Sequence, residues 1–235
     1  MMGTPGSPSA PTGVPLRIGV IAAVLAAATV AAVGTSLVGV GGARGPIPWW
    51  ACAIMVFGAE AVAFRFRVFG TPHAVSPGGI PMVVALGLLS PIGFVLARVT
   101  GALGVALVER KPFSAAAFNV SLGGLEAVVV VAVHGALIQD ASLVSPAGAT
   151  AAVAAVLAGS VLASLLVTLA VCGGVRGVPR GLGRMLFLGN ALEFGAALLG
   201  GLVLVSFSAG DAIGAGVLLA AGLIVFEADV LRRRA

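Results

Sequence analysis

The sequence has few charged residues and no tyrosine, and both features limit what kind of protein it can be. Only 9% of its 235 residues are charged, whereas a soluble domain carries about 25%. Hydrophobic residues make up 60% of the chain, and its mean hydropathy is +1.18. Water cannot solvate a surface with so little charge, so the composition excludes a soluble globular domain and predicts an integral membrane protein.

Catalytic and metal-binding motifs are also missing. The sequence contains no glycine-rich phosphate loop after a strand, no HExxH zinc motif and no CxxC pair. Its two cysteines, Cys52 and Cys172, lie in or at the end of apolar runs. We expect them near opposite membrane faces, packed as small apolar residues and not joined by a disulfide. We therefore expect a chain that is not an enzyme and that needs no metal or other cofactor.

Small residues are abundant instead, with 35 glycines in the chain. They let transmembrane helices approach closely, which favours an all-α, polytopic helical bundle. A β-barrel would need short segments of alternating polarity, and we do not find them. Residues 1–16, rich in Pro, Gly and Ser, are expected to form a disordered tail, and residues 17–235 a single transmembrane domain. The apolar run at 18–40 is too long for a signal peptide and is interpreted as an uncleaved first span.

Seven to eight membrane segments are expected in this bundle. The second, at 48–64, opens with Trp49-Trp50, as suits the headgroup interface, and a loop follows at 69–79. Residues 80–108 are either one helix kinked at Ser90-Pro91 or two segments. The first of the two would be too short to cross about 30 Å of hydrocarbon. We favour the split or re-entrant form. The later spans are expected at 114–138, 147–171, 187–208 and 212–230.

Basic residues occur in alternate connections, and this pattern predicts the topology. The connections that hold Asp140 and Asp211 carry no Lys or Arg. This places the C-terminus of a multi-pass cell-membrane protein in the cytoplasm, and a split 80–108 places Arg65 and Arg67 there too. The expected cytoplasmic anchors are Arg110, Lys111, Arg176, Arg180, Arg184, Arg232, Arg233 and Arg234. Contact with lipid headgroups explains the net charge of +5, and no nucleic-acid partner is expected.

Ionisable and amide side chains fall inside the apolar segments, where a charge is costly unless it is paired. Asn119 and Glu126 are seven residues apart and lie on almost the same helix face, beside a Gly123-Gly124 notch. His134 is turned by less than a quarter of the circumference and is placed in a partly wet site near the outer interface. The candidate ligand-binding or switch residues are Arg98, Asn119, Glu126, His134, Asn190 and Glu193.

Arg98 and Glu126 are predicted to form an ion pair. Each lies about ten residues or slightly more from the turn between their helices, so at about 1.5 Å per residue their depths match. Glu193 or Glu60 is the alternative partner. The polar residues serve either as structural contacts between helices or as a ligand pocket or proton-sensitive switch.

A more specific pattern spans residues 77–126. It consists of Ile80-Pro81, an apolar run to Ser90-Pro91, Arg98 and Gly101, the turn Arg110-Lys111-Pro112, and Phe118-Asn119. This pattern resembles the membrane-embedded N-terminal input domain of bacterial, often actinobacterial, cyclic-di-GMP signalling proteins, where it precedes GGDEF or EAL output domains. The resemblance implies a non-catalytic sensory domain that regulates cyclic-di-GMP turnover. It also implies a homodimer. No GGDEF or EAL signature stands in a soluble context here, so the resemblance further implies a cytoplasmic output domain or partner.

Two other functions stay open. A small-substrate-binding subunit of a membrane transporter, similar in outline to the capturing subunits of vitamin importers, is indicated by the break at Pro91 and by midplane polar residues. A structural membrane protein explains the composition equally well. The candidate helix-packing face between protomers consists of Gly195, Gly200, Gly201, Gly214 and Gly216.

Overall fold

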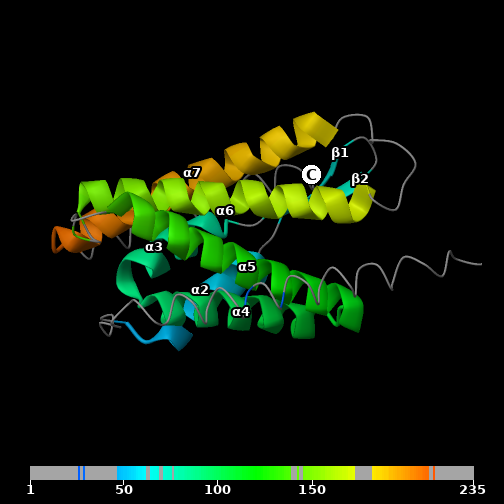
Figure 1. The fold of residues 1–235 in the computed structure, drawn as a ribbon, viewed down its shortest axis with the longest axis horizontal. Coiled ribbons are helices and arrows are strands. Elements are labelled where there is room, and N and C mark those ends of the chain that lie inside the picture. The colour runs from blue at the N-terminus through cyan, green and yellow to red at the C-terminus, as the bar shows by residue number, and fades with distance from the viewer. Residues whose placement is uncertain are drawn as a thin grey trace, which may run out of the picture.

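The fold is an elongated bundle of helices (Figure 1). The computed structural model describes residues 47–61, 64–68, 71–75, 77–138, 145–172 and 182–211, with single positions 26, 29, 142 and 214. Within these residues the elements follow in the order α2 (Trp49–Ala61), β1 (Phe64–Val68), β2 (Thr71–Val75), α3 (Gly79–Leu88), α4 (Pro91–Val108), α5 (Phe113–Ile138), α6 (Pro146–Cys172) and α7 (Leu182–Ser208).

Four of the described helices contain stretches long and apolar enough to cross a membrane. These stretches are Pro91–Val108, Phe113–Ile138, Pro146–Ala170 and Gly189–Ser208. They match the predicted second segment of 80–108 and the predicted spans at 114–138, 147–171 and 187–208. Helices α2 and α3 are apolar but shorter, with 13 and 10 residues. The predicted tail at 1–16 and the predicted spans at 18–40 and 212–230 lie outside the described residues. The total of seven to eight segments therefore stays a prediction.

The segment 80–108 is split, as favoured from the sequence. Leu89 is extended, with φ −108° and ψ 159°, and ends α3. Ser90 then caps α4, since its side-chain oxygen accepts a hydrogen bond from the Gly93 backbone nitrogen at 3.2 Å. Pro91 follows at the first helical position, where its missing N–H leaves no bond unmade. Proline also disfavours helical backbone at the residue before it, so the two helices cannot merge here.

Short helix α3 is buried among α2, α4, α6 and α7, with which it is in contact. Nine of its ten residues are buried. The approach of α7 depends on small residues, because a Cβ atom on Gly79 would lie 2.8 Å from the Ala197 nitrogen. A Cβ atom on Gly200 would lie equally close to the Ile80 oxygen. Glycine thus lets the two backbones touch, and α3 meets protein on all sides instead of lipid.

This packing corrects the predicted glycine face between protomers. Gly200 faces α3, and a Cβ atom on Gly201 would contact Val153 of α6 at 3.1 Å, so both residues serve contacts within the chain. Only open space surrounds Gly195. Gly214 lies against Asp211, and Gly216 is outside the described residues. The prediction was wrong for Gly200 and Gly201 because sequence spacing does not say which neighbour a helix face meets.

A β-hairpin replaces part of the loop expected at 69–79. Strands β1 and β2 pair antiparallel, with Phe64 opposite Val75 and Val68 opposite Thr71. The prediction missed the alternation of apolar and charged residues in the sequence FRFRV of β1, which is the period-two signal of a strand. Figure 1 shows the hairpin at the end of the bundle where α6 ends and α7 begins.

One end of the bundle carries basic residues, and the positions of the helix ends show which end it is. Helix α2 runs alongside α4 in the same direction, since Gly93 lies near Trp49 and Gly104 near Phe57. Helix α4 ends at Val108, and the turn that carries Arg110 and Lys111 leads into α5. We call this the basic end. Helices α2, α4 and α6 end here, and α5 and α7 begin here.

The turn at the basic end has a defined backbone conformation. The Lys111 nitrogen donates to the Ala106 oxygen at 3.0 Å, and the Arg110 nitrogen donates to the Leu107 oxygen at 3.2 Å. This pair of bonds is the Schellman motif, which usually places glycine at the left-handed position. Here Arg110 occupies that position with φ 51°. The motif fixes where Lys111 leaves α4 and so positions it beside the cavity described next.

Candidate functional site

Arg98 lies at the centre of the site and joins three helices. Its Nε and Nη2 atoms donate to Glu126 Oε2 at 3.2 and 2.8 Å, which confirms the predicted ion pair. Its Nη1 atom donates to Glu60 Oε1 at the end of α2. Glu60 was predicted only as an alternative partner, but the guanidinium binds both carboxylates at once. The arginine of α4 therefore connects α2 to α5.

The guanidinium lies against Gly123 on α5, whereas the neighbouring Gly124 faces Thr29 and Val99. A Cβ atom on Gly123 would lie 3.6 Å from Arg98 Cζ, so the planar group packs directly against the helix surface. On the next helix, a Cβ atom on Gly159 would lie 3.2 Å from Glu126 Cγ. The ion pair thus packs against Gly123 of α5 and Gly159 of α6.

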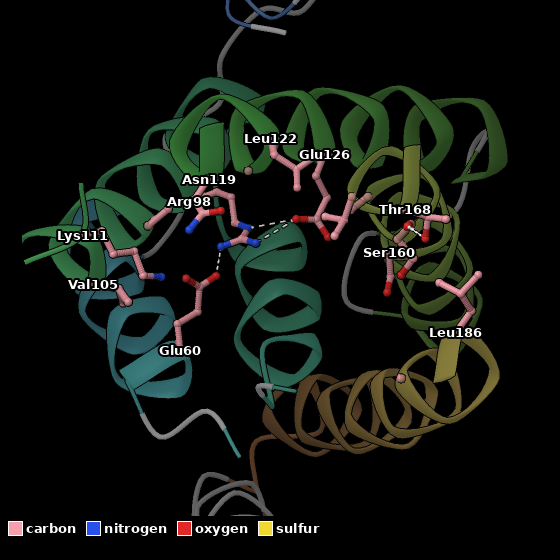
Figure 2. Close-up of a pocket in the computed structure, with 16 residues that line it drawn as sticks. Glu60, Arg98, Val105, Lys111, Asn119, Leu122, Glu126, Ser160, Thr168 and Leu186 are labelled. Atoms are coloured by element: carbon pink, nitrogen blue, oxygen red, sulfur yellow. Dashed lines mark hydrogen bonds and ion pairs between the residues drawn. The ribbon is translucent and has the colours of Figure 1, made fainter. Parts of the chain in front are cut away.

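A cavity of about 380 Å³ opens beside this ion network. Its volume is near the lower end of the range of small-molecule sites, about 300–1,000 Å³. Figure 2 shows charged residues on one side and hydroxyl residues on the other. The lining comes from α2, α4, α5, α6 and α7 and from the turn after α4: Glu60, Arg98, Ala102, Val105, Lys111, Asn119, Leu122, Gly123, Glu126, Ser160, Ala163, Ser164, Val167, Thr168, Leu186 and Gly189.

Three of the predicted site residues line the cavity: Arg98, Asn119 and Glu126. In Figure 2 the side chain of Asn119 lies beside Arg98. Asn190 does not line the cavity, but its Oδ1 accepts from Ser160 Oγ at 3.3 Å and its Nδ2 donates to the Leu186 oxygen at 2.8 Å. It fixes α6 against α7 at the edge of the site.

Glu193 and His134 are placed differently. Glu193 lies on α7 close to the start of α3, where a Cβ atom on Gly79 would be 3.1 Å from its Oε1. It interacts electrostatically with Glu126, Arg98 and Glu60. His134 is 5% exposed, and its Nε2 has no hydrogen-bond partner among the described residues. The expectation of a partly wet histidine was wrong because α6 begins against this part of α5, with Gly148 beside the imidazole.

Sequence analysis missed the hydroxyl side of the cavity. Ser160, Ser164 and Thr168 follow at intervals of four residues and so lie on one face of α6. Thr168 Oγ1 donates to the Ser164 backbone oxygen at 2.8 Å. Their spacing in an apolar segment was the available signal, but serine and threonine also occur in such helices as ordinary packing residues.

Two of the predicted basic anchors have described side chains, Arg110 and Lys111. Lys111 Nζ lies 2.9 Å from Glu109 Oε2, and Lys111 also lines the cavity. The lysine therefore belongs to the site as well as to the basic end. The other predicted anchors, Arg176, Arg180, Arg184, Arg232, Arg233 and Arg234, have side chains outside the described residues.

The arrangement is suited to binding a polar molecule. Among the described residues, no three His, Cys, Asp or Glu side chains lie together as a metal site would require. Cys52 is buried in the core and unbonded, away from the cavity. The cavity offers a charged side formed by Arg98, Glu60 and Glu126, a side with hydroxyl groups, and apolar residues between them. Comparison of the chain with protein-family models, curated proteins and solved structures gives no match.

Proposed function

We propose that the chain is a polytopic membrane protein that binds a small polar ligand in the cavity beside Arg98, and that it acts as a non-catalytic sensory input module. The cavity itself is the observation that carries this proposal. A polar hollow among apolar helices is costly, since each charge inside a membrane must be paired or hydrated. A ligand site gives such a hollow a purpose that helix packing alone does not.

The connection of helices by Arg98 supplies a means of response. A ligand that binds Glu60 or Glu126 competes with the guanidinium, and α2 and α5 are held together through that guanidinium. The ligand would thus favour one packing of these helices over another. A ligand shifts such an equilibrium only by its difference in affinity for the two states. The ion network can therefore act as a switch. Arg98 binds both carboxylates in one state, and the ligand replaces Arg98 at a carboxylate in the other.

The signalling part of the proposal depends on sequence resemblance. The pattern from Ile80-Pro81 to Phe118-Asn119 resembles input domains of cyclic-di-GMP signalling proteins. Three of the residues in that pattern, Arg98, Lys111 and Asn119, line the cavity. On this proposal the protein forms a homodimer, and a cytoplasmic output domain or partner reads its state.

A substrate-binding subunit of a transporter is the second candidate, and one observation favours it. Helix α3 is short, buried, and separated from α4 by the extended Leu89. Discontinuous helices of this kind line substrate sites near the midplane of many transporters. If the bound compound enters cells only when this protein and a partner ATPase are both present, transport is the better assignment.

A pair of glycine substitutions on α7 tests ligand binding. Gly189 lines the cavity and Gly195 does not, and a Cβ atom at either position would meet no atom within 4 Å. Gly189→Leu should therefore fill the cavity, whereas Gly195→Leu should change only an exposed face of the same helix. The measurement is native mass spectrometry of the full chain released from lipid nanodiscs.

We expect a bound small molecule on the wild type and on the Gly195→Leu control, and its loss from Gly189→Leu. Equal retention by both variants would place the molecule elsewhere. The absence of any bound compound other than lipid from the wild type, after purification from its native membrane, would refute the proposal.

The membrane orientation is part of the proposal and needs its own test. We place the basic end in the cytoplasm, because Arg110 and Lys111 lie there and basic residues are retained on that side. In a background without the native cysteines, Lys111→Cys should be shielded from an impermeant thiol reagent added to intact cells. Ser145→Cys, before α6 at the opposite end, should be labelled. Labelling of Lys111→Cys alone would reverse the orientation.

A further inference from the structure

Among the described residues, carboxylates outnumber cationic groups in the ion network. Glu60 and Glu126 both bind Arg98 directly, so two carboxylates share one guanidinium. Only 8% of the Glu126 side chain and 19% of the Glu60 side chain are exposed. In such surroundings an uncompensated negative charge is expensive, and a bound cation would relieve it.

Lys111 does not supply that compensation. Its Nζ lies 2.9 Å from Glu109 Oε2, so this cation already has a carboxylate of its own. Figure 2 shows Lys111 on the same side of the cavity as Glu60. Among the described residues, Lys111 and Glu109 thus balance each other, whereas Glu60, Glu126 and Arg98 leave an excess of one negative charge.

The hydrogen bonds of Arg98 use only one oxygen of each carboxylate. Both bonds to Glu126 end on Oε2, and the bond to Glu60 ends on Oε1. The second oxygens, Glu126 Oε1 and Glu60 Oε2, accept no hydrogen bond from the described part of the chain. Both residues line the cavity. An ammonium group has three N–H donors and no acceptor, so it complements these oxygens.

The remaining lining favours an organic cation over a metal ion. The cavity of about 380 Å³ is far larger than an ion requires, and Val105, Leu122 and Val167 form part of its wall. Ser160 and Thr168 lie on the side opposite Lys111 (Figure 2). This wall would contact the carbon skeleton of a ligand, and the hydroxyl groups would bind a second polar group on it.

We propose that the cavity binds a small amine-bearing solute, whose ammonium group lies between Glu60 and Glu126 and whose carbon skeleton lies against the apolar wall. This inference rests on the proposed ligand-binding function and names the chemical class of the ligand. A neutral or anionic compound of the same size would add no positive charge beside Glu60 and Glu126 and would bind more weakly.

Three probes of matched length test the charge requirement: aminobutanol, butanediol and hydroxybutyrate. The thermal midpoint of the full chain in lipid nanodiscs is measured against the concentration of each probe. A ligand that binds only the folded state raises the midpoint, and its titration gives an apparent affinity. We expect aminobutanol alone to raise the midpoint.

Two variants and one control assign the effect to the cavity. Glu60→Gln removes one carboxylate while Arg98 keeps Glu126, and we expect it to weaken aminobutanol binding about tenfold or more. Gly189→Leu fills the cavity without changing charge and should abolish the response even if Glu60→Gln folds poorly. Gly195→Leu, on an exposed face of the same helix that does not line the cavity, should leave it unchanged.

Preference for butanediol or hydroxybutyrate would overturn the cationic class while leaving a ligand cavity in place. An aminobutanol response that persists in Gly189→Leu would overturn the inference, because the amine would then bind elsewhere. Absence of any response to the three probes would also overturn it. That last result would not refute the proposed ligand-binding function, which native mass spectrometry of the purified chain tests independently.

Discussion

Replacement of Arg98 by methionine should destabilise the bundle strongly, and the structure gives the size of the effect. The substitution removes two hydrogen bonds to Glu126 and one to Glu60, and it leaves both carboxylates without a cation. Removing one partner of a buried ion pair costs about 3–5 kcal/mol. The cavity lets Glu60 keep some hydration, since 19% of its side chain is exposed. We therefore expect a loss near the lower limit, about 3 kcal/mol.

The same reasoning predicts rescue. In the triple variant Arg98→Met, Glu60→Gln, Glu126→Gln the unpaired charges are gone, and the amides can bond to one another or to water. Replacement of a whole buried ion network by neutral groups is often close to neutral for stability. We expect the triple variant to lie within about 1 kcal/mol of the wild type.

The assay is the free energy of unfolding in mixed micelles, measured by titration with a denaturing detergent. Single, double and triple variants form a thermodynamic cycle, which isolates the coupling between the three side chains. A cost below about 1 kcal/mol for Arg98→Met would refute the reasoning, because surface ion pairs are worth that little. A triple variant as unstable as the single one would refute it too, since charge would then not be the cause.

Three further predictions concern the backbone. Gly200→Ala should lower the free energy of unfolding by about 1–3 kcal/mol, because its Cβ would lie 2.8 Å from the Ile80 oxygen; Gly195→Ala, in open space on the same helix, should be neutral or stabilising in the same titration. Arg110→Gly should raise the thermal midpoint, because it removes a cost of about 1–2 kcal/mol for a left-handed L-residue; a lower midpoint would show that the arginine side chain matters more. Ser90→Ala should cost about 1 kcal/mol through the lost cap, and unchanged hydrogen exchange at the start of α4 would contradict this.

Sequence reasoning worked where the signal was local. Ser90-Pro91 predicts the break between α3 and α4 because both the cap and the proline act on their immediate neighbours. The depth argument found the Arg98–Glu126 pair because the two helices are joined by a short turn, so distance along the chain translates directly into depth.

It worked less well where the partner comes from far along the chain. Glu60 binds Arg98 only because α2 lies parallel to α4, and no local pattern encodes that arrangement. The burial of His134 and the inward-facing Gly200 likewise depend on which helices are neighbours. The hydroxyl face of α6 was visible in the spacing of Ser160 and Thr168, but nothing in the sequence showed that it faces a cavity.

The enclosure of α3 also has a consequence for how the protein is made. As the ribosome delivers the chain, α3 is synthesised well before α7, yet α7 supplies the surface against which α3 packs: the Ala197 backbone at Gly79 and the Leu204 side chain at Gly87. At 10 residues, α3 is too short to be retained in the bilayer by its own hydropathy. The nascent protein must therefore keep α3 with one side unpacked until α7, the sixth described helix, has been synthesised. Enclosure of α3 therefore depends on a helix that is synthesised late, and this part of the bundle can pack only after α7 has been made.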